Sequence, residues 1–173
     1  MARKLTRVGV LGAVSAALML AMAGPAAAAE VKVNFLDVQH YSDIKDNDGF
    51  PRPEVLKDLE VHLVKLAQSH LPGRDVLIEV TDVDLAGFVE PFSRDGRWIR
   101  VMRTVTPPAL ELRYEVREAG KVVRSGSAKL RDLDYQNGLS RYFSSEPLRY
   151  EFQMLDRWFD QEFGAVPGKL GAK

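Results

Sequence analysis

The sequence contains no cysteine among its 173 residues. Disulfides, thiolate metal sites, cysteine nucleophiles and a lipid anchor on cysteine are therefore excluded. Histidine is scarce too: there are three, and no helical His-Glu-x-x-His zinc motif occurs. A glycine-rich phosphate loop and the Gly-x-Ser-x-Gly motif of hydrolases are also missing. We therefore predict no catalytic residue, no cofactor and no metal site, and an enzyme is the less favoured class.

The sequence has no excess of charge of either sign. It carries 24 basic and 24 acidic residues. Three of the basic residues and none of the acidic ones fall among the first 29, so the remainder has a net charge of −3. Nucleic-acid binding depends on a basic surface that neutralises phosphates. We therefore expect no nucleic-acid partner.

The first 29 residues have the pattern of a secretory signal peptide. Arg3, Lys4 and Arg7 precede an uncharged apolar run of 16 residues, 8–23, and a run of alanines ends at Ala29. The apolar run is shorter than the roughly 20 residues that a helix needs to cross a bilayer. We therefore predict a signal peptide over residues 1–29 rather than a transmembrane anchor. Cleavage before Glu30 would release the protein, and we expect it in the Gram-negative periplasm.

The remaining 144 residues suit one domain, which we place at residues 30–164, followed by a flexible tail over 165–173. Alternating apolar and polar residues predict strands over 31–36, 75–85, 98–103 and, most clearly, 109–116. Residues 121–133 predict a further strand, with an irregularity at Gly126. Leucines at helical spacing predict a helix over 53–70. A stripe from Leu148 to Phe159 predicts a second, which begins near residue 146 and ends at Gly164.

The order of these elements is β-α-β-β-β-β-α, which predicts the α+β class. We expect a two-layer sandwich in which two helices cover one face of an antiparallel-rich sheet of about five strands. Both helices should lie on the same face, because the charged residues of 109–116 would otherwise be buried without partners.

Two aspartates interrupt the apolar face of the strand over 75–85. In a regular strand, Asp82 and Asp84 continue the face of Val80, where ionised carboxylates are costly to bury. Either the strand twists out of the core after Val80, or the pair meets cations or backbone donors. Their spacing of about 7 Å could hold a divalent cation or serve acid–base chemistry, but the sequence shows no companion group. We favour a turn-forming role; a small-ligand site, a metal site or an active site near a pocket stays as the alternative.

The C-terminal part of the chain is rich in aromatic residues. Tyr150 and Trp158 extend the apolar arc of the second predicted helix, and Tyr135, Tyr142 and Phe143 lie in the preceding loop. A broadly buried helix is the simpler interpretation. The other is a partner-binding edge, because exposed apolar patches mark interfaces. Together with Asp82 and Asp84, the four tyrosine and tryptophan residues are our candidate binding residues.

These observations favour an exported, non-enzymatic binding or interaction module. Its partner would be an envelope protein or a small ligand, and the oligomeric state stays open.

Several segments together resemble a known family. They are VKVNF (31–35), YSD (41–43), EVTDVDLAG (79–87), LRYEV (112–116), LRDLDY (130–135) and LRYEFQMLDRWF (148–159). In this order they resemble the bacterial family catalogued as domain of unknown function 3016, over residues 31–163. The resemblance implies an exported bacterial protein. It implies no activity, so it contributes no site residues.

Overall fold

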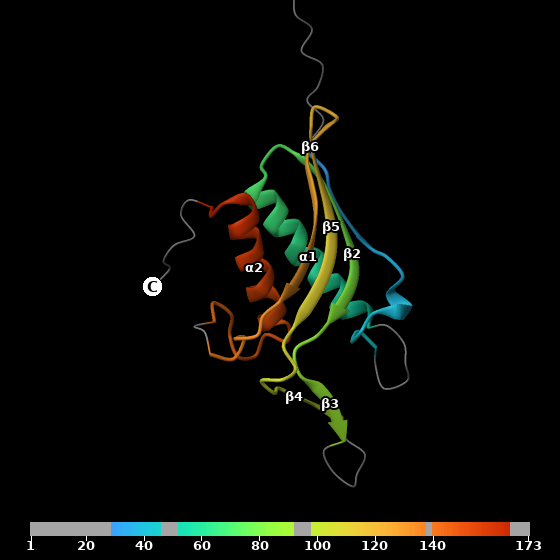
Figure 1. The fold of residues 1–173 in the computed structure, drawn as a ribbon, viewed down its shortest axis with the longest axis vertical. Coiled ribbons are helices and arrows are strands. Elements are labelled where there is room, and N and C mark those ends of the chain that lie inside the picture. The colour runs from blue at the N-terminus through green and yellow to red at the C-terminus, as the bar shows by residue number, and fades with distance from the viewer. Residues whose placement is uncertain (1–28, 46–51, 92–97, 138–139, 167–173) are drawn as a thin grey trace, which may run out of the picture.

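The computed structural model confirms the α+β class and the order of the elements (Figure 1). It describes residues 29–45, 52–91, 98–137 and 140–166. The predicted signal peptide, apart from Ala29, and most of the predicted tail lie outside these residues. The helices and strands are β1 (Val31–Phe35), the 3₁₀ helix η1 (Val38–His40), α1 (Pro53–His70), β2 (Asp75–Asp84), β3 (Phe88–Pro91), β4 (Trp98–Val101), β5 (Ala109–Glu118), β6 (Lys121–Arg131) and α2 (Arg149–Phe163).

The strands form two separate sheets. The main sheet has the order β1-β2-β5-β6, in which β1 runs parallel to β2 and the other neighbours are antiparallel. Strands β3 and β4 pair with each other and, within the described residues, with no other strand; they form a hairpin that projects from the lower end of the main sheet in Figure 1. The sequence predicted β4 but not β3, and gave no sign that the two stand apart.

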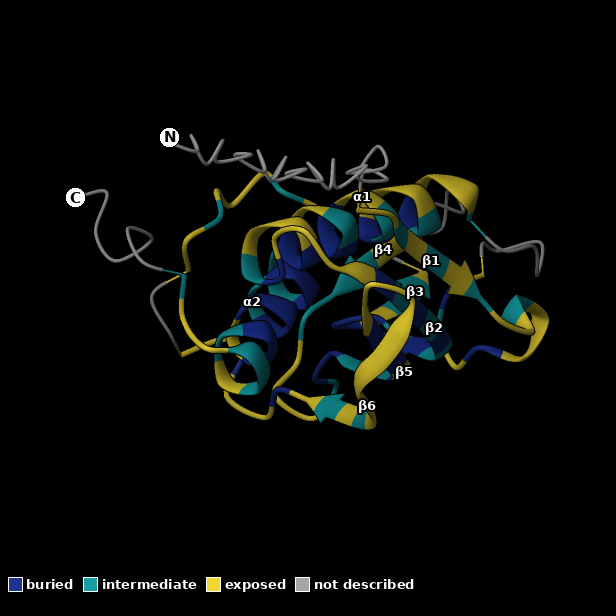
Figure 2. Cartoon of the chain, turned by 90° about the horizontal axis from the view of Figure 1, so that it is seen from above, coloured by how far each residue is buried: buried dark blue, intermediate teal, exposed yellow. Residues whose placement is uncertain are grey.

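One face of the main sheet holds the core. Alternate residues of β5, including Leu110 and Leu112, are buried, while Arg113 on the opposite face is exposed. Both helices lie on the core face (Figure 2), and their buried residues form one cluster with those of the strands. The fully buried side chains of the helices include Leu59 of α1 and Phe159 of α2. The predicted arrangement of two helices on one face is therefore confirmed, and the other face of the sheet stays hydrated.

A β-bulge in β2 explains how this strand accommodates its aspartates. Val80 lies opposite Leu112, but the next pair joins Asp82 to Glu111, so that Thr81 is an extra residue. One extra residue reverses the alternation of side chains. Val83 therefore points into the core and is fully buried, whereas Asp82 and Asp84 lie on the same side as Glu111. The carboxylates leave the core as expected, while the strand itself stays in it.

Gly126 does not mark the irregularity that the sequence suggested. It pairs in regular register with Tyr114, and the shift in this pair of strands lies at Val116/Arg117. A Cβ on Gly126 would lie 2.8 Å from the Tyr114 hydroxyl oxygen. The glycine therefore makes room for the ring of Tyr114, which packs edge-to-face on Trp158 and donates a hydrogen bond to Glu162.

Gly87 fixes the direction in which the hairpin leaves the main sheet, and its substitution gives a first prediction. Its φ is +81°, and a Cβ there would lie 2.7 Å from the backbone oxygen of Val101. Left-handed backbone costs a non-glycine residue about 1–2 kcal/mol, and the close approach adds about 1–3 kcal/mol. Gly87→Ala should therefore lower the free energy of unfolding by about 2–5 kcal/mol in urea denaturation.

Gly73→Ala is the matched control, because Gly73 has a φ of +77° but a Cβ added to it would meet no heavy atom within 4 Å. Gly73→Ala should lower the free energy of unfolding only by the cost of the left-handed backbone, about 1–2 kcal/mol. Equal losses in the two variants would show that the contact between Gly87 and Val101 does not constrain the hairpin.

Candidate functional site

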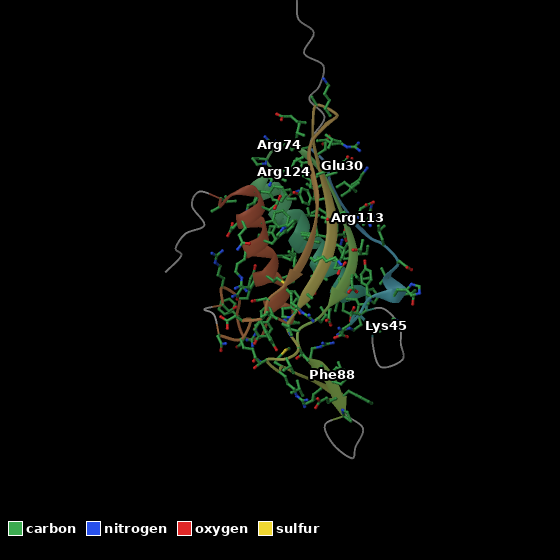
Figure 3. All side chains as sticks on the ribbon, viewed as in Figure 1. Glu30, Lys45, Arg74, Phe88, Arg113 and Arg124 are labelled. Carbon is green, nitrogen blue, oxygen red and sulfur yellow. The ribbon has the colours of Figure 1, made fainter. Side chains whose placement is uncertain are left out.

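A hollow with a volume of about 520 Å³ lies where the hairpin joins the main sheet. Its walls come from residues 42–45, the end of β2, both strands of the hairpin, the segment 105–107 and Arg131 of β6. Lys45 and Phe88 lie at this end of the molecule (Figure 3). Segments far apart in the sequence thus meet around one concave surface, which we take as the candidate site.

Asp82 has a structural role at the edge of this site. The backbone N–H of Ser42 donates to its Oδ1 and the Ser42 hydroxyl donates to its Oδ2, each at 2.7 Å. The N–H of Asp43 in turn donates to the carbonyl of Val83 at 2.9 Å. Asp82 lies within β2 and secures the segment 42–43 against this strand, so its role is structural but it does not form the turn that the sequence favoured.

Asp84 lines the hollow itself. Its nearest cation is Arg131, at 4.0 Å between Nη2 and Oδ2. Partial burial, followed by the charge of Asp43, raises the pKa of Asp84 above its ordinary value, although Arg131 and Arg100 act in the opposite direction. The ionised form of Asp84 is thus incompletely compensated. A smaller recess of about 280 Å³ also borders Asp82 and Asp84 on the open face, so cavities lie beside both predicted aspartates.

Arg100 of β4 fastens the hairpin to the main sheet. Its Nη1 donates to Oδ2 of Asp43 at 2.6 Å and to the carbonyls of Ala86 and Gly87 at 3.2 and 3.3 Å. Three acceptors from two segments surround this one nitrogen, which has two N–H groups, so at least one N–H is shared between two acceptors. Sequence reasoning missed this residue, because an arginine in a short strand carries no sign of what it contacts.

Glu151 of α2 is a second residue that sequence reasoning missed. Only 2% of it is exposed, and its Oε1 accepts a hydrogen bond from the N–H of Ala86 at 2.7 Å. Burial raises the pKa of Glu151, and the Ala86 hydrogen bond opposes this effect. A signal was available: Glu151 lies three residues after Leu148 and four before Leu155, so it occupies the buried stripe of the helix.

The structure does not bring the predicted aromatic residues together as one exposed patch. Tyr135 is buried, donates to the carbonyl of Arg103 at 2.7 Å and packs edge-to-face on Tyr150. Trp158 belongs to the core. Tyr142 is half-buried and donates to Oδ2 of Asp156 at 2.9 Å. These aromatic residues anchor the segment before α2, whereas the aromatic ring of Phe143 in that loop is strongly exposed.

A histidine and an aspartate meet beneath Tyr142. Nε2 of His62 lies 3.1 Å from Oδ1 of Asp156, and the His62 ring stacks on Phe152 at 4.2 Å between centroids. The adjoining recess, of about 320 Å³, is lined by no serine or threonine that such a pair could activate as a nucleophile. The contacts of His62, Asp156 and Tyr142 join α1, α2 and the loop before α2.

Metal binding and membrane spanning find no support in the described part of the chain. No group of three or more histidine, aspartate or glutamate side chains could hold a metal ion there. No helix in the same residues is long and apolar enough to cross a membrane.

The fold and the site define a small α+β protein with a hydrated sheet face and a hollow beneath a projecting hairpin. The chain belongs to the family described as "Protein of unknown function (DUF3016)", whose family model matches residues 29–161. The resemblance noted in the sequence is therefore confirmed. No curated protein and no solved structure matches the chain.

The two aspartates should respond oppositely to substitution, which gives the second prediction. Asp82→Ala removes two hydrogen bonds from Ser42 and should lower the free energy of unfolding by about 1–3 kcal/mol. Asp84→Asn should instead raise the free energy of unfolding at pH 7. The folded state raises the pKa of Asp84 above its ordinary 3.8, so ionisation of this residue destabilises the fold.

The pH dependence provides the check on Asp84. Its protonated form prevails in both the folded and unfolded states below about pH 4, so the gain of Asp84→Asn should vanish there. The gain should grow as the pH rises through the folded-state pKa, as measured by urea denaturation between about pH 3.5 and pH 7. A variant less stable than the wild type at pH 7 would show that Arg131 compensates the charge.

Proposed function

We propose that the protein is an exported, periplasmic and non-enzymatic interaction module, which binds an envelope protein through the hairpin β3–β4 and the hollow at its base. The observation that carries this proposal is a cluster of exposed apolar side chains around the hollow. Phe88 and Trp98, which are 59% and 52% exposed, line the hollow together with the exposed Val105. Ile99, also exposed, belongs to the same hairpin. Export rests on the pattern of residues 1–29.

Exposed aromatic side chains on a projecting element are typical of a binding surface. Large apolar side chains left in water forgo about 1.5–3 kcal/mol each that burial would supply, and clusters of them mark interfaces. Tryptophan is among the residues that most often dominate binding energy. The hairpin presents Trp98 from a fixed position, because Arg100 of the same strand is tied to Asp43. A preorganised surface loses less entropy when it binds.

A small-ligand site in the same hollow is the second candidate. Its volume of about 520 Å³ falls within the range of about 300–1,000 Å³ usual for ligand pockets. Asp84 and Lys45 supply polar groups of opposite charge, and Trp98 supplies an apolar wall. This candidate keeps the predicted Asp84 in a binding role, whereas Asp82 is occupied by Ser42.

Site-specific photo-crosslinking tests the first candidate. With p-benzoylphenylalanine in place of Ile99, ultraviolet illumination of cells should give one or a few discrete protein adducts. Val61 on α1, which is also exposed, is the control position and should give none. The double substitution Phe88→Ser with Trp98→Ser should abolish the adducts while the circular dichroism spectrum stays unchanged.

The outcomes separate the two candidates. Adducts of equal intensity from positions 99 and 61, or none from position 99, would contradict an interaction module. A low-molecular-weight component of a periplasmic extract that quenches Trp98 fluorescence, without any protein adduct, would instead support the small-ligand candidate.

A further inference from the structure

We propose a second interaction surface: the outer edge of β6 accepts an extended acidic segment of a partner protein as a fifth strand of the main sheet. Strand addition of this kind uses the backbone for affinity and pockets beside the edge for side-chain specificity. Within the described residues, β6 has both an unpaired backbone edge and a recess beside it. This surface lies on the main sheet. Arg131 at one end of it also borders the hollow at the base of the hairpin, but the inference requires no binding at the hairpin.

β6 is a long edge strand. It has 11 residues, and among the described parts of the chain only β5 pairs with it. A strand edge of this kind presents unpaired N–H and C=O groups. From Arg124 to Arg131 the strand runs in continuous register with β5, while the register shift lies just before this segment. The segment 124–131 contains no proline and is mostly exposed, so its edge can receive another strand.

A recess of about 300 Å³ lies beside this segment, between β6 and α2. Leu130, Met154 and Trp158 line it, together with Lys129, Arg131 and the ion pair that Arg157 forms with Asp132. A strand added to β6 would direct every second side chain toward the helix-covered face. An apolar side chain of the partner could therefore enter the recess. Trp158, a candidate binding residue from the sequence, would contact this side chain despite belonging to the core.

Charge identifies the kind of partner. β6 carries Lys121, Arg124, Lys129 and Arg131 and no acidic residue. The acidic partners of three of them lie on inner neighbours, namely Glu162 of α2, Glu111 of β5 and Asp84 of β2. A second copy of β6 would bring four further cations to the row, and like charges across strands destabilise a pair. An acidic segment would be attracted, so the occupant is an acidic strand rather than a second copy.

A defined peptide tests the inference. An acetylated and amidated peptide of four Val-Glu repeats is titrated into the full-length protein that carries Trp98→Phe. Trp158 is then the single tryptophan and reports on the recess. Saturation should shift Trp158 emission and slow the hydrogen exchange of amides in residues 124–131 at least tenfold. The affinity should fall as salt is raised.

Matched variants and peptides identify the source of binding. The double substitution Lys129→Gln with Arg131→Gln should raise the Kd for the Val-Glu peptide at least fivefold. Arg113→Gln, which removes a cation from the open face of β5 (Figure 3), should leave the affinity unchanged. A Val-Lys peptide should not bind. Trp98→Phe changes no residue of this surface. A failure of the peptide to bind at β6 would therefore leave the proposed binding through the hairpin untouched.

Three results would overturn the inference. The first is an absence of protection at residues 124–131 in the presence of the Val-Glu peptide. The second is equal binding of the Val-Lys peptide. The third is a dimer, detected by sedimentation, in which these amides are protected without any peptide, because that result would make a second copy the occupant.

Discussion

The extra residue at Thr81 is the constraint on which the lower end of the molecule depends. Without it, β2 would send Asp82 and Asp84 into the core and Val83 into water. Burying an ionised carboxylate without a partner costs several kcal/mol, and exposing a valine forgoes about 1.5–3 kcal/mol. The bulge avoids both penalties, since Val83 is fully buried and the carboxylates face outward. The packing of the core and the polarity of the site thus have the same local cause.

The outward carboxylates in turn organise the segments around the hollow. Asp82 binds Ser42, which places the neighbouring Asp43 beside the end of β2. Asp43 then receives Arg100, and Arg100 also caps two carbonyls where the chain turns into the hairpin. Ala86 connects this network to the helices, because its N–H donates to Glu151 while its carbonyl accepts from Arg100. Backbone groups that leave a sheet must find such partners when they are buried.

Sequence pattern predicted the layers of the fold because those layers depend on periodicity. The alternation from Leu110 to Val116 and the leucine spacing of α1 each report which face is buried, without reference to any distant residue. The bulge at Thr81 was not predicted. The apolar positions change parity between Val80 and Val83, but a strand that twists out of the core after Val80 accounts for the same pattern. Strand β3 was missed for a related reason: Pro91 and the turn residues Ala86 and Gly87 masked a strand of only four residues.

The aromatic residues show why a candidate site is harder to predict than a fold. Trp158 and Trp98 have the same chemistry, but one belongs to the core and the other stands on a hairpin outside it. An apolar arc on α2 indicates what could be buried; whether a neighbour covers it depends on contacts such as the one between Tyr142 and Asp156. The main sheet and its two helices bury most of their apolar side chains in one core. The surface left for recognition lies where this core ends: the hairpin beyond β2 and the outer edge of β6.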